Sequence, residues 1–424
     1  MIISSKFPLE KATKPFHEIL LLQCIEMHKS DPKKMAMIMS DNEVDAVSFY
    51  QIYQYSTAFS VWLTNNGFKK GDILLLAMHN SWQFVICCLG AWAAGLVVSP
   101  TTSQFTYYEL NYQIEDSTAK LVVTDDIMLP RILKAIEKLS VKSVICSSKS
   151  PSNYENVLDL MSIITSKLQK PSSSVEINMD EDLILLPYSS GTTGLPKGVM
   201  VSHSNYSSML SAYIKKCSED SKAIGLSKFI PPEKGVSFLP FYHVMGLFGT
   251  LINLYNGTTQ IVMPRFDLKK FLQNIQDHKI TSAAIVPAVA IVLAESPLLE
   301  SYDLSSLLAI ACGSAPLSKT ISYGMTEMTC ASHNGSIGAV EGSVGLLLPG
   351  TQMKIVSESG ALCGPGEKGE MWIKGPQVMK GYWRREKQTR EIMSSDGFMR
   401  TGKQLSSDAL LVETTFDNFI NNTY

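Results

Sequence analysis

The sequence has no surplus of either charge. Its 424 residues include 37 Lys and Arg against 39 Asp and Glu, which gives a net charge of −2 at pH 7. A protein that binds nucleic acid or an anionic membrane through its overall charge needs a basic excess. We therefore expect neither partner, and recognition is expected to come from a local site.

Paired cysteines are also lacking. The eight cysteines form no CxxC pair, show no metal-site spacing with histidine, and mostly lie within apolar runs. Such cysteines are usually reduced packing residues. The N-terminus has no secretory signal pattern, and the C-terminal NTY is not a peroxisomal address. These absences favour a cytoplasmic protein without disulfides.

No apolar run is long enough to cross a membrane. The most hydrophobic run, residues 82–98, is interrupted by Gly90 and Gly95, and it falls short of the roughly 20 residues that a spanning helix needs. The pattern instead predicts a helix that Ser81 caps and Gly95 ends, followed by a strand at LVVSP.

Short β-rich runs alternate with helical patterns along the chain. The runs cover residues 73–78, 120–125, 141–147, 183–189, 259–264, 282–288 and 307–313. This alternation is typical of α/β proteins with mostly parallel sheets. The clearest helical pattern covers residues 267–279, where Phe271, Leu272 and Ile275 share one face behind Asp267 as N-cap.

The composition predicts three units and a tail. The stretch KPSSS at 170–174 is expected to separate an N-terminal α/β subdomain, residues 1–174, from a second α/β subdomain, residues 175–334. Gly-rich turns and short alternating runs then predict a small β subdomain, residues 335–402. Residues 403–424 are a divergent tail.

The stretch PYSSGTTGLPKGVM, residues 187–200, places glycines, hydroxyls and one lysine after a predicted strand. It is not a Walker A loop, because GxxxxGK[ST] fails at Pro196 and Gly198. Its chemistry still suits a polyphosphate, since glycines let backbone N–H groups converge on an anion while Lys197 neutralises charge. The alternative is an ordinary polar loop between strands, and the loop residues alone leave both interpretations open.

The longer stretch YSSGTTGLPKGVMVSH, residues 188–203, resembles the phosphate-loop signature of the adenylate-forming (AMP-binding) enzymes, which include acyl-CoA synthetases, 4-coumarate–CoA ligases and luciferases. Further motifs of that family follow in order: FLPFYHVMG (238–246), ACGSAPLSK (311–319), YGMTE (323–327), GSVGLLLPG (342–350), GEMWIKGPQVMKGYW (369–383) and GFMRTG (397–402). The resemblance implies the large N-terminal domain of these enzymes, with two α/β subdomains and a small β subdomain.

The same resemblance implies a two-step reaction. A small carboxylic acid attacks the α-phosphate of ATP and releases pyrophosphate, and the acyl-adenylate then acylates coenzyme A. The implied cofactors are ATP, Mg²⁺ and coenzyme A as co-substrate. The expected catalytic residues are Lys197, His243, Thr326 and Glu327.

Roles for single residues follow from the matched motifs. Lys197 is expected to offset the charge of the leaving pyrophosphate. Glu327 is expected to coordinate Mg²⁺, and Thr326 to contact the α-phosphate. The other expected nucleotide-binding residues are Ser189, Ser190, Gly191, Thr192, Thr193, Gly194, Gly313, Ser314, Ala315, Tyr323, Gly324 and Met325, with Tyr323 against the adenine.

On the acid side, the resemblance assigns His243 to the junction of the acyl pocket and the coenzyme A channel. Gly246 and Gly313 are expected beside the substrate, with Gly246 letting it pass close to the backbone. Taken alone, a histidine next to Phe241 and Tyr242 is more often only a packed neighbour of aromatic rings.

Two segments depart from the family's pattern. Only residues 320–322 separate GSAPLSK from YGMTE, where the family has a helix and a strand, and a crossover between parallel strands needs at least about 10 residues. We therefore expect a lost strand or a displaced YGMTE motif, and a damaged adenine site. After GFMRTG, Lys403 replaces the aspartate that grips the ribose, and the family's smaller C-terminal domain is not expected in residues 403–424.

The leading interpretation is an acid–CoA ligase with impaired activity. The alternative is a non-catalytic nucleotide- or acyl-binding protein or an inactive isoform. An unrelated P-loop NTPase is disfavoured by Pro196 and Gly198. Neither the acid nor the oligomeric state can be read from the sequence.

Overall fold

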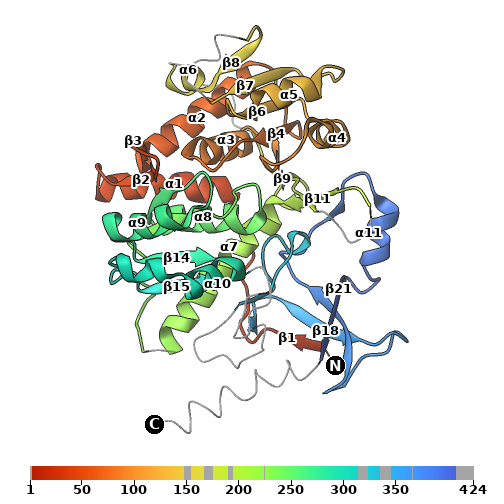
Figure 1. Cartoon of the computed structure of the whole chain (residues 1–424). Coiled ribbons are helices and arrows are strands. Elements are labelled where there is room, and N and C mark those ends of the chain that lie inside the picture. The colour runs from red at the N-terminus through yellow and green to blue at the C-terminus, as the bar shows by residue number, and fades with distance from the viewer. Residues whose placement is uncertain are drawn as a thin grey trace.

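A computed structural model describes residues 2–147, 154–166, 175–189, 194–223, 225–313, 323–334, 345–364 and 366–406. The expected linker at 170–174 lies outside these residues. The fold is a mixed α/β structure with two large sheets and a smaller β unit, stacked from the top to the lower right of Figure 1. The expected fold class is confirmed.

The first large sheet has the strand order β10-β11-β9-β5-β4-β6-β7-β8, with β20 paired to β11. Its strands are β4 (Ile73–Ala77), β5 (Val97–Pro100), β6 (Leu121–Thr124), β7 (Ser143–Cys146), β8 (Val157–Asp159), β9 (Leu183–Leu185), β10 (Tyr188–Ser189), β11 (Lys197–Ser202) and β20 (Gly381–Tyr382). Strands β4 to β9 pair in parallel, whereas β11 is antiparallel to its neighbours.

The side chains of strand β4 show that this sheet is covered on both faces. Leu74 and Leu76 pack in the cluster that holds side chains of the helices α2 (Phe49–Asn65), α3 (Trp82–Ala93) and α6 (Leu160–Thr165). The alternate residues Ile73 and Leu75 pack instead with α4 (Tyr107–Ser117) and α5 (Leu129–Ile136). A continuous apolar run is what such a doubly covered strand requires.

The second large sheet has the order β15-β14-β12-β13-β2-β3. Its strands are β2 (Met35–Met39), β3 (Asn42–Ser48), β12 (Lys234–Ser237), β13 (Thr259–Val262), β14 (Ser282–Ile285) and β15 (Ala309–Cys312). The accompanying helices are α1 (Phe16–Ser30), α7 (His203–Ala223), α8 (Val244–Tyr255), α9 (Leu268–His278) and α10 (Pro287–Glu295). The predicted caps are present: Lys270 N–H donates to Asp267 Oδ1 at 2.9 Å, and Phe84 N–H to Ser81 Oγ at 3.3 Å.

The β unit is antiparallel, in the order β1-β18-β19-β21. It consists of β1 (Ile2–Ser4), β18 (Gln352–Val356), β19 (Lys368–Lys374) and β21 (Met399–Ser406), with α11 (Glu386–Ile392) beside it. The remaining short elements are β16 (His333–Asn334), β17 (Leu346–Leu347) and the 3-10 turns η2 (Pro297–Ser301) and η3 (Thr326–Met328).

Strand pairing crosses the expected subdomain boundaries. Strand β1 joins the C-terminal β unit, β2 and β3 join the second large sheet, and β9 to β11 join the first. Strand β21 also continues to Ser406, past the expected boundary at residue 402. Sequence patterns locate strands but not their distant partners. Subdomain boundaries drawn at linkers therefore do not show which strands pair with a sheet in another part of the chain.

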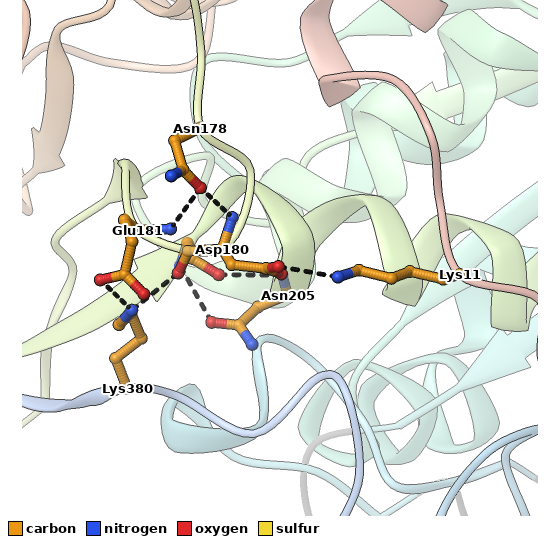
Figure 2. A network of polar contacts seen from close by, with 7 residues as sticks. Lys11, Asn178, Asp180, Glu181, Asn205 and Lys380 are labelled. Carbon is orange, nitrogen blue, oxygen red and sulfur yellow. Dashed lines mark hydrogen bonds and ion pairs between the residues drawn. The ribbon is translucent and has the colours of Figure 1, made fainter.

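A cluster of hydrogen bonds connects the turn before β9 with the N-terminal segment and with the chain that leads into β20 (Figure 2). Lys11 Nζ donates to Asp180 Oδ2 at 2.7 Å, and Lys380 Nζ donates to the Asp180 carbonyl at 2.7 Å and to Glu181 Oε2 at 2.9 Å. Asn205 Nδ2 donates to the carbonyl groups of Pro376 and Val378. The N-terminal segment and the chain leading into β20 are thereby fixed to the sheet that carries the phosphate loop.

Strand β15 lies at the edge of the second large sheet. Within the described residues its only ladder partner is β14, and Ile310 is 52% exposed. The segment that follows, residues 314–322, lies outside the described residues, and the next described strand, β16, pairs with β17 instead. The expected loss of a strand beside β15 stays a prediction, because residues 314–322 lie outside the described part of the chain.

Two expectations from the sequence can be compared with the structure. Five of the eight cysteines are buried, as their positions in apolar runs predicted, and burial raises the pKa of Cys24 to about 12. In the parts of the chain that the structure describes, no helix combines the length and the apolar character needed to cross a bilayer.

Candidate active site

The phosphate-loop motif forms a β-hairpin at the edge of the first sheet. Strands β10 and β11 are antiparallel, with Ser189 opposite Lys197 and Tyr188 opposite Gly198. Side chains directly opposite each other share one face of a ladder, so a hydroxyl and a cation leave the hairpin side by side. The expected residues Ser190, Gly191, Thr192 and Thr193 lie outside the described part, and Gly194 begins its return limb with a positive φ of 104°.

Glu327 is the acidic group of the site. It lies in η3, is 5% exposed, and accepts hydrogen bonds at Oε1 from Ser189 Oγ and from Tyr382 OH, both at 3.0 Å. Its other oxygen, Oε2, has no hydrogen-bond partner among the described residues. The structure therefore brings together two residues that the sequence assigned to the phosphates and the metal, Ser189 and Glu327.

Tyr382 is the residue that the motif analysis missed. Strand β20 carries it next to β11, where Val199 pairs with Tyr382 and Trp383 N–H donates to the Gly198 carbonyl at 2.8 Å. Its ring lies 4.8 Å from Lys197 Nζ, measured to the ring centroid, which is within the range of a cation–π contact. The KGYW motif contains Tyr382, but no spacing rule indicates that its hydroxyl reaches Glu327.

Gly198 shows why the Walker pattern fails here. A Cβ atom at this position would lie 3.1 Å from the Leu186 side chain and 3.2 Å from that of Trp383. The Ser or Thr of a Walker loop would therefore push apart β9, β11 and the segment after β20.

A second group of polar contacts anchors the hairpin from outside. Tyr188 OH donates to Asp116 Oδ2 at 2.7 Å, and Arg385 Nη2 donates to Asp116 Oδ1 at 2.5 Å. Tyr112 OH donates to the carbonyl of Pro196, inside the motif, at 2.9 Å. Burial and the Asp116 carboxylate raise the pKa of Tyr188, so its phenol stays protonated as a donor. Sequence reasoning found none of these anchors.

An apolar cavity of about 470 Å³ lies at the second sheet, between α7, α8, β12, β14 and β15. Gly246, Gly313, Tyr323 and Gly324 all contribute to its wall. The cavity thus reaches the YGMTE motif, which also delivers Glu327 to the hairpin. Its size falls within the range of roughly 300–1,000 Å³ that is usual for small-molecule sites.

Gly246 lines this cavity, but the structure gives a different reason for its glycine. A Cβ atom there would lie 2.1 Å from the carbonyl oxygen of Pro240, so the close neighbour is the chain's own backbone. The expectation that Gly246 makes room for substrate is corrected to this extent. His243 lies one turn earlier, as N-cap residue of α8 without a side-chain cap bond, and desolvation lowers its pKa although part of its surface is exposed.

Tyr323 and Gly313 both line the cavity, whereas Ser314 and Ala315 lie outside the described residues. Tyr323 exchanges backbone hydrogen bonds of 3.2 Å with His333. Met325 and Thr326 follow and start the η3 turn. Lys403 extends β21, where Gly402 N–H donates to Glu370 Oε1 at 2.8 Å. The roles of these residues toward a nucleotide stay predictions.

The donor set can be compared with the needs of Mg²⁺. No group of three or more His, Cys, Asp or Glu side chains suited to a metal occurs in the described ranges. Magnesium is usually held by one or two carboxylates together with substrate phosphates and waters. A buried Glu327 with an uncommitted Oε2 fits that pattern.

The α/β fold carries a hairpin with a hydroxyl and a lysine, a buried carboxylate beside it and an adjoining apolar cavity, a combination typical of a nucleotide-dependent enzyme. Residues 26–383 match the AMP-binding enzyme family, and the chain belongs to that family. The chain is 44% identical to Acyl-CoA synthetase 7 from Caenorhabditis elegans over 93% of its own length and 75% of the relative's. It is 31% identical to Peroxisomal OPC-8:0-CoA ligase 1 from Arabidopsis thaliana over 84% of its length and 67% of the relative's.

A solved structure gives the same assignment. The long-chain-fatty-acid–CoA ligase from Archaeoglobus fulgidus superposes with a TM-score of 0.80 at 25% identity, over 95% of this chain and 83% of that one. The relatives are acid–CoA ligases, which confirms the expected class of enzyme.

Proposed function

We propose that the protein is an ATP-dependent acid–CoA ligase that adenylates a carboxylic acid and then transfers the acyl group to coenzyme A. The observation that carries the proposal is the cluster of Ser189, Lys197, Glu327 and Tyr382, which the YGMTE segment connects to an apolar cavity. The proposed phosphate-binding cluster and the proposed acid-binding cavity are then connected through Tyr323 and Gly324. ATP, Mg²⁺ and coenzyme A are the cofactors that this reaction requires.

In the first step, an oxygen of the acid attacks the α-phosphorus and the bond to pyrophosphate breaks. Negative charge grows on the leaving group, and Lys197, projecting from β11 beside Ser189, is placed to offset it. The Tyr382 ring fixes the direction of the Lys197 side chain. The Ser189 hydroxyl donates its proton to Glu327 and thereby helps to orient that carboxylate.

Glu327 would hold Mg²⁺, and the ion would neutralise phosphate oxygens when bound. The chain's own contribution is to orient the carboxylate. The hydroxyls of Ser189 and Tyr382 both donate to Oε1, and Met379 N–H donates to the Glu327 backbone carbonyl at 2.9 Å. These contacts from three segments leave Oε2 as the atom available to a cation.

We further propose that adenylation is weak in this chain. The support is the edge position of β15, whose end at Gly313 leads into the nucleotide motif. Among the described residues β15 is paired on one side only, and an adenine site at such a strand has less support than one inside a sheet. Lys403, a donor where an acceptor for ribose is expected, acts in the same direction.

The test is acid-dependent exchange of labelled pyrophosphate into ATP by the purified chain. We expect slow exchange that requires both Mg²⁺ and the acid, and that Lys197→Ala abolishes. A chain with a family helix and strand inserted between Lys319 and Thr320 should exchange faster. A folded chain that shows no exchange, and whose insertion variant shows none, would support the alternative of a non-catalytic nucleotide- or acyl-binding protein.

The small carboxylic acid is the partner that this function requires. We also propose a cytoplasmic location, which the lack of CxxC pairs and the apolar surroundings of the cysteines in the sequence support. Fractionation of cells that express the chain tests the location.

A further inference from the structure

We infer that the cavity binds an apolar monocarboxylic acid with a long tail and that Gly249 on α8 determines how bulky this tail can be. The inference rests on the proposed ligase function and names the class of acid. It is carried by three observations: the chemistry of the cavity wall, the course of α8 along it, and the empty space in front of Gly249.

Among the described residues, the cavity wall has no charged side chain. Its lining consists of apolar and small residues with a few neutral polar ones, and no Asp, Glu, Lys, Arg or His is among them. One of the polar residues, Ser237, already donates to Gln260 Oε1 at 2.7 Å. A second carboxylate or an ammonium group on the substrate would lose its hydration here without gaining a partner. The wall therefore selects against dicarboxylic and amino acids.

Helix α8 follows the cavity for two turns. Gly246, Gly249 and Asn253 all line it, at spacings of three and four residues that place them on one helical face. Seven residues of helix correspond to about 10 Å. Gly246 packs against Leu239 and Pro240 just after the end of β12, whereas Asn253 lies 3.5 Å from the Cβ position of Gly235 in β12. Gly313 follows the end of β15, which runs in the same direction as β12. The carboxylate is therefore placed at the Gly246 end, and the tail would extend along α8 toward Asn253.

The two glycines on this face differ in the space that surrounds them. A Cβ atom at Gly246 would collide with Pro240, whereas one at Gly249 would meet no atom within 4 Å. Packing therefore does not require glycine at position 249, and glycine weakens a helix interior relative to alanine. The space that Gly249 leaves open belongs to the cavity and is available to the tail of the acid.

The lining at the far end shows that the tail can be long. Ile230, which contributes to the wall, is 65% exposed, and the β15 side chains Ala309 and Ala311 are exposed as well. The cavity thus opens to solvent beyond α8 and along the unpaired edge of β15. A tail longer than α8 can leave through this opening, so chain length has no sharp upper limit.

The test is direct binding without ATP or coenzyme A, by displacement of a dansyl-labelled undecanoic acid from the full chain. Dodecanoic acid should displace the label, and octanedioic acid, whose second carboxylate would end inside the cavity, should bind at least 10-fold more weakly than octanoic acid. Gly249→Leu should weaken dodecanoic acid at least 10-fold and propanoic acid, which ends before Gly249, less than 3-fold, and Gly249→Ala should lie between it and the unchanged chain. Ala223→Leu, at an exposed position at the end of α7, is the matched control and should change neither affinity.

Equal binding of octanoic and octanedioic acids would overturn the proposed acid class. Unchanged affinity of dodecanoic acid in Gly249→Leu, or an equal loss for both chain lengths in Gly249→Ala, would overturn the role of Gly249. Because binding needs no nucleotide, a chain that binds dodecanoic acid but exchanges no pyrophosphate contradicts the ligase function alone. Exchange with short or charged acids in the absence of dodecanoic acid binding contradicts only the inference made here.

Discussion

Ser189 Oγ donates a hydrogen bond of 3.0 Å to Glu327 Oε1, although the two residues are 138 positions apart in the chain. Ser189 ends the first strand of the phosphate hairpin, and Glu327 ends the YGMTE motif. The same carboxylate oxygen accepts from Tyr382, which β20 places beside β11. Three motifs that are separate in sequence thus share one buried oxygen atom, and a change at any of them is expected to reach the phosphates.

Glu327→Gln tests the metal role directly. The amide has nearly the same shape, and its oxygen can still accept from Ser189 and Tyr382, but it lacks the charge that Mg²⁺ prefers. We expect ATP affinity in the presence of Mg²⁺ to fall at least about 10-fold, which corresponds to ~1.4 kcal/mol. Equilibrium dialysis of ATP with Mg²⁺ and with EDTA measures this loss.

The matched control for that change is Glu386→Gln, at an exposed position in the first turn of α11. It removes the same charge from a side chain exposed to solvent and should leave the Mg²⁺ dependence intact. If Glu327→Gln binds ATP with the Mg²⁺ dependence of the unchanged chain, Glu327 is not the metal ligand.

Tyr382→Phe separates the hydroxyl from the ring. The variant loses the bond to Glu327 but keeps the aromatic face against Lys197 Nζ. A buried hydrogen bond to a charged group is worth about 1.5–3 kcal/mol, and we expect the free energy of unfolding in urea to fall by about that amount. The KM for ATP should rise while the KM for the acid stays constant.

Tyr382→Leu completes the comparison because it also removes the ring. It should orient Lys197 less well and reduce kcat further than Tyr382→Phe. Equal kcat values for the two variants would show that the cation–π contact has no part in the reaction.

The two glycines of α8 should respond to alanine with opposite signs. Gly246→Ala places a methyl group 2.1 Å from the Pro240 carbonyl oxygen, and overpacking of this kind costs about 1–3 kcal/mol or more. Gly249→Ala meets open space, and it should raise the free energy of unfolding by about 0.5–1 kcal/mol through the better helix propensity of alanine. Urea denaturation of both variants measures the difference, and a loss of stability in Gly249→Ala would contradict it.

Part of the fold and of the candidate site could be predicted from the sequence. Apolar runs and caps predicted β4, β5 and α9 within a few residues, because burial and capping act locally. The motif resemblance predicted that Ser189, Lys197 and Glu327 belong to one site. It did not predict Tyr382, Asp116 or Tyr112, because their contacts depend on strand pairing between segments up to 269 residues apart.

Contacts between distant segments also decide why position 246 is a glycine and where the subdomains divide, and local sequence patterns do not contain them. A glycine in a motif indicates a close approach, but not which group approaches, and here it is the backbone of Pro240. Strand β1 pairs with β18 more than 300 residues later. No local pattern in residues 2–4 contains that information.

The edge strand β15 is expected to promote association of the chain. Within the described residues it pairs only with β14, and it presents Ile310 at 52% exposure next to Leu308 at 81%. Edge strands without charges are templates for pairing with other chains. Ile310→Lys should therefore lower light scattering on warming while changing the unfolding midpoint little.

A suitable comparison is Ile291→Lys on α10, which is also about half exposed but carries its backbone hydrogen bonds within a helix. If association proceeds through strand pairing, Ile291→Lys should reduce scattering less than Ile310→Lys. Equal effects would point to apolar surface in general and not to the strand edge.

Three buried histidines should make the fold sensitive to mild acid. Burial lowers the pKa of His17 to about 3 and the pKa values of His203 and His333 to about 4. An unfolded histidine has a pKa near 6.5, so below that pH the unfolded chain binds protons that the folded chain does not. The free energy of unfolding then falls as the pH drops from about 6.5 toward the folded pKa, by up to ~1.4 kcal/mol per pH unit for each group.

His203→Leu isolates one of these groups. The ring of His203 lies 5.6 Å from that of His17, between centroids, and neither of its nitrogens has a hydrogen-bond partner among the described residues. The apolar replacement removes one titrating site without breaking a hydrogen bond. Between pH 6.5 and 5 the variant should lose about 2 kcal/mol less than the unchanged chain, as urea midpoints at both pH values would show. Parallel losses in the two chains would mean that His203 takes up its proton in the folded state.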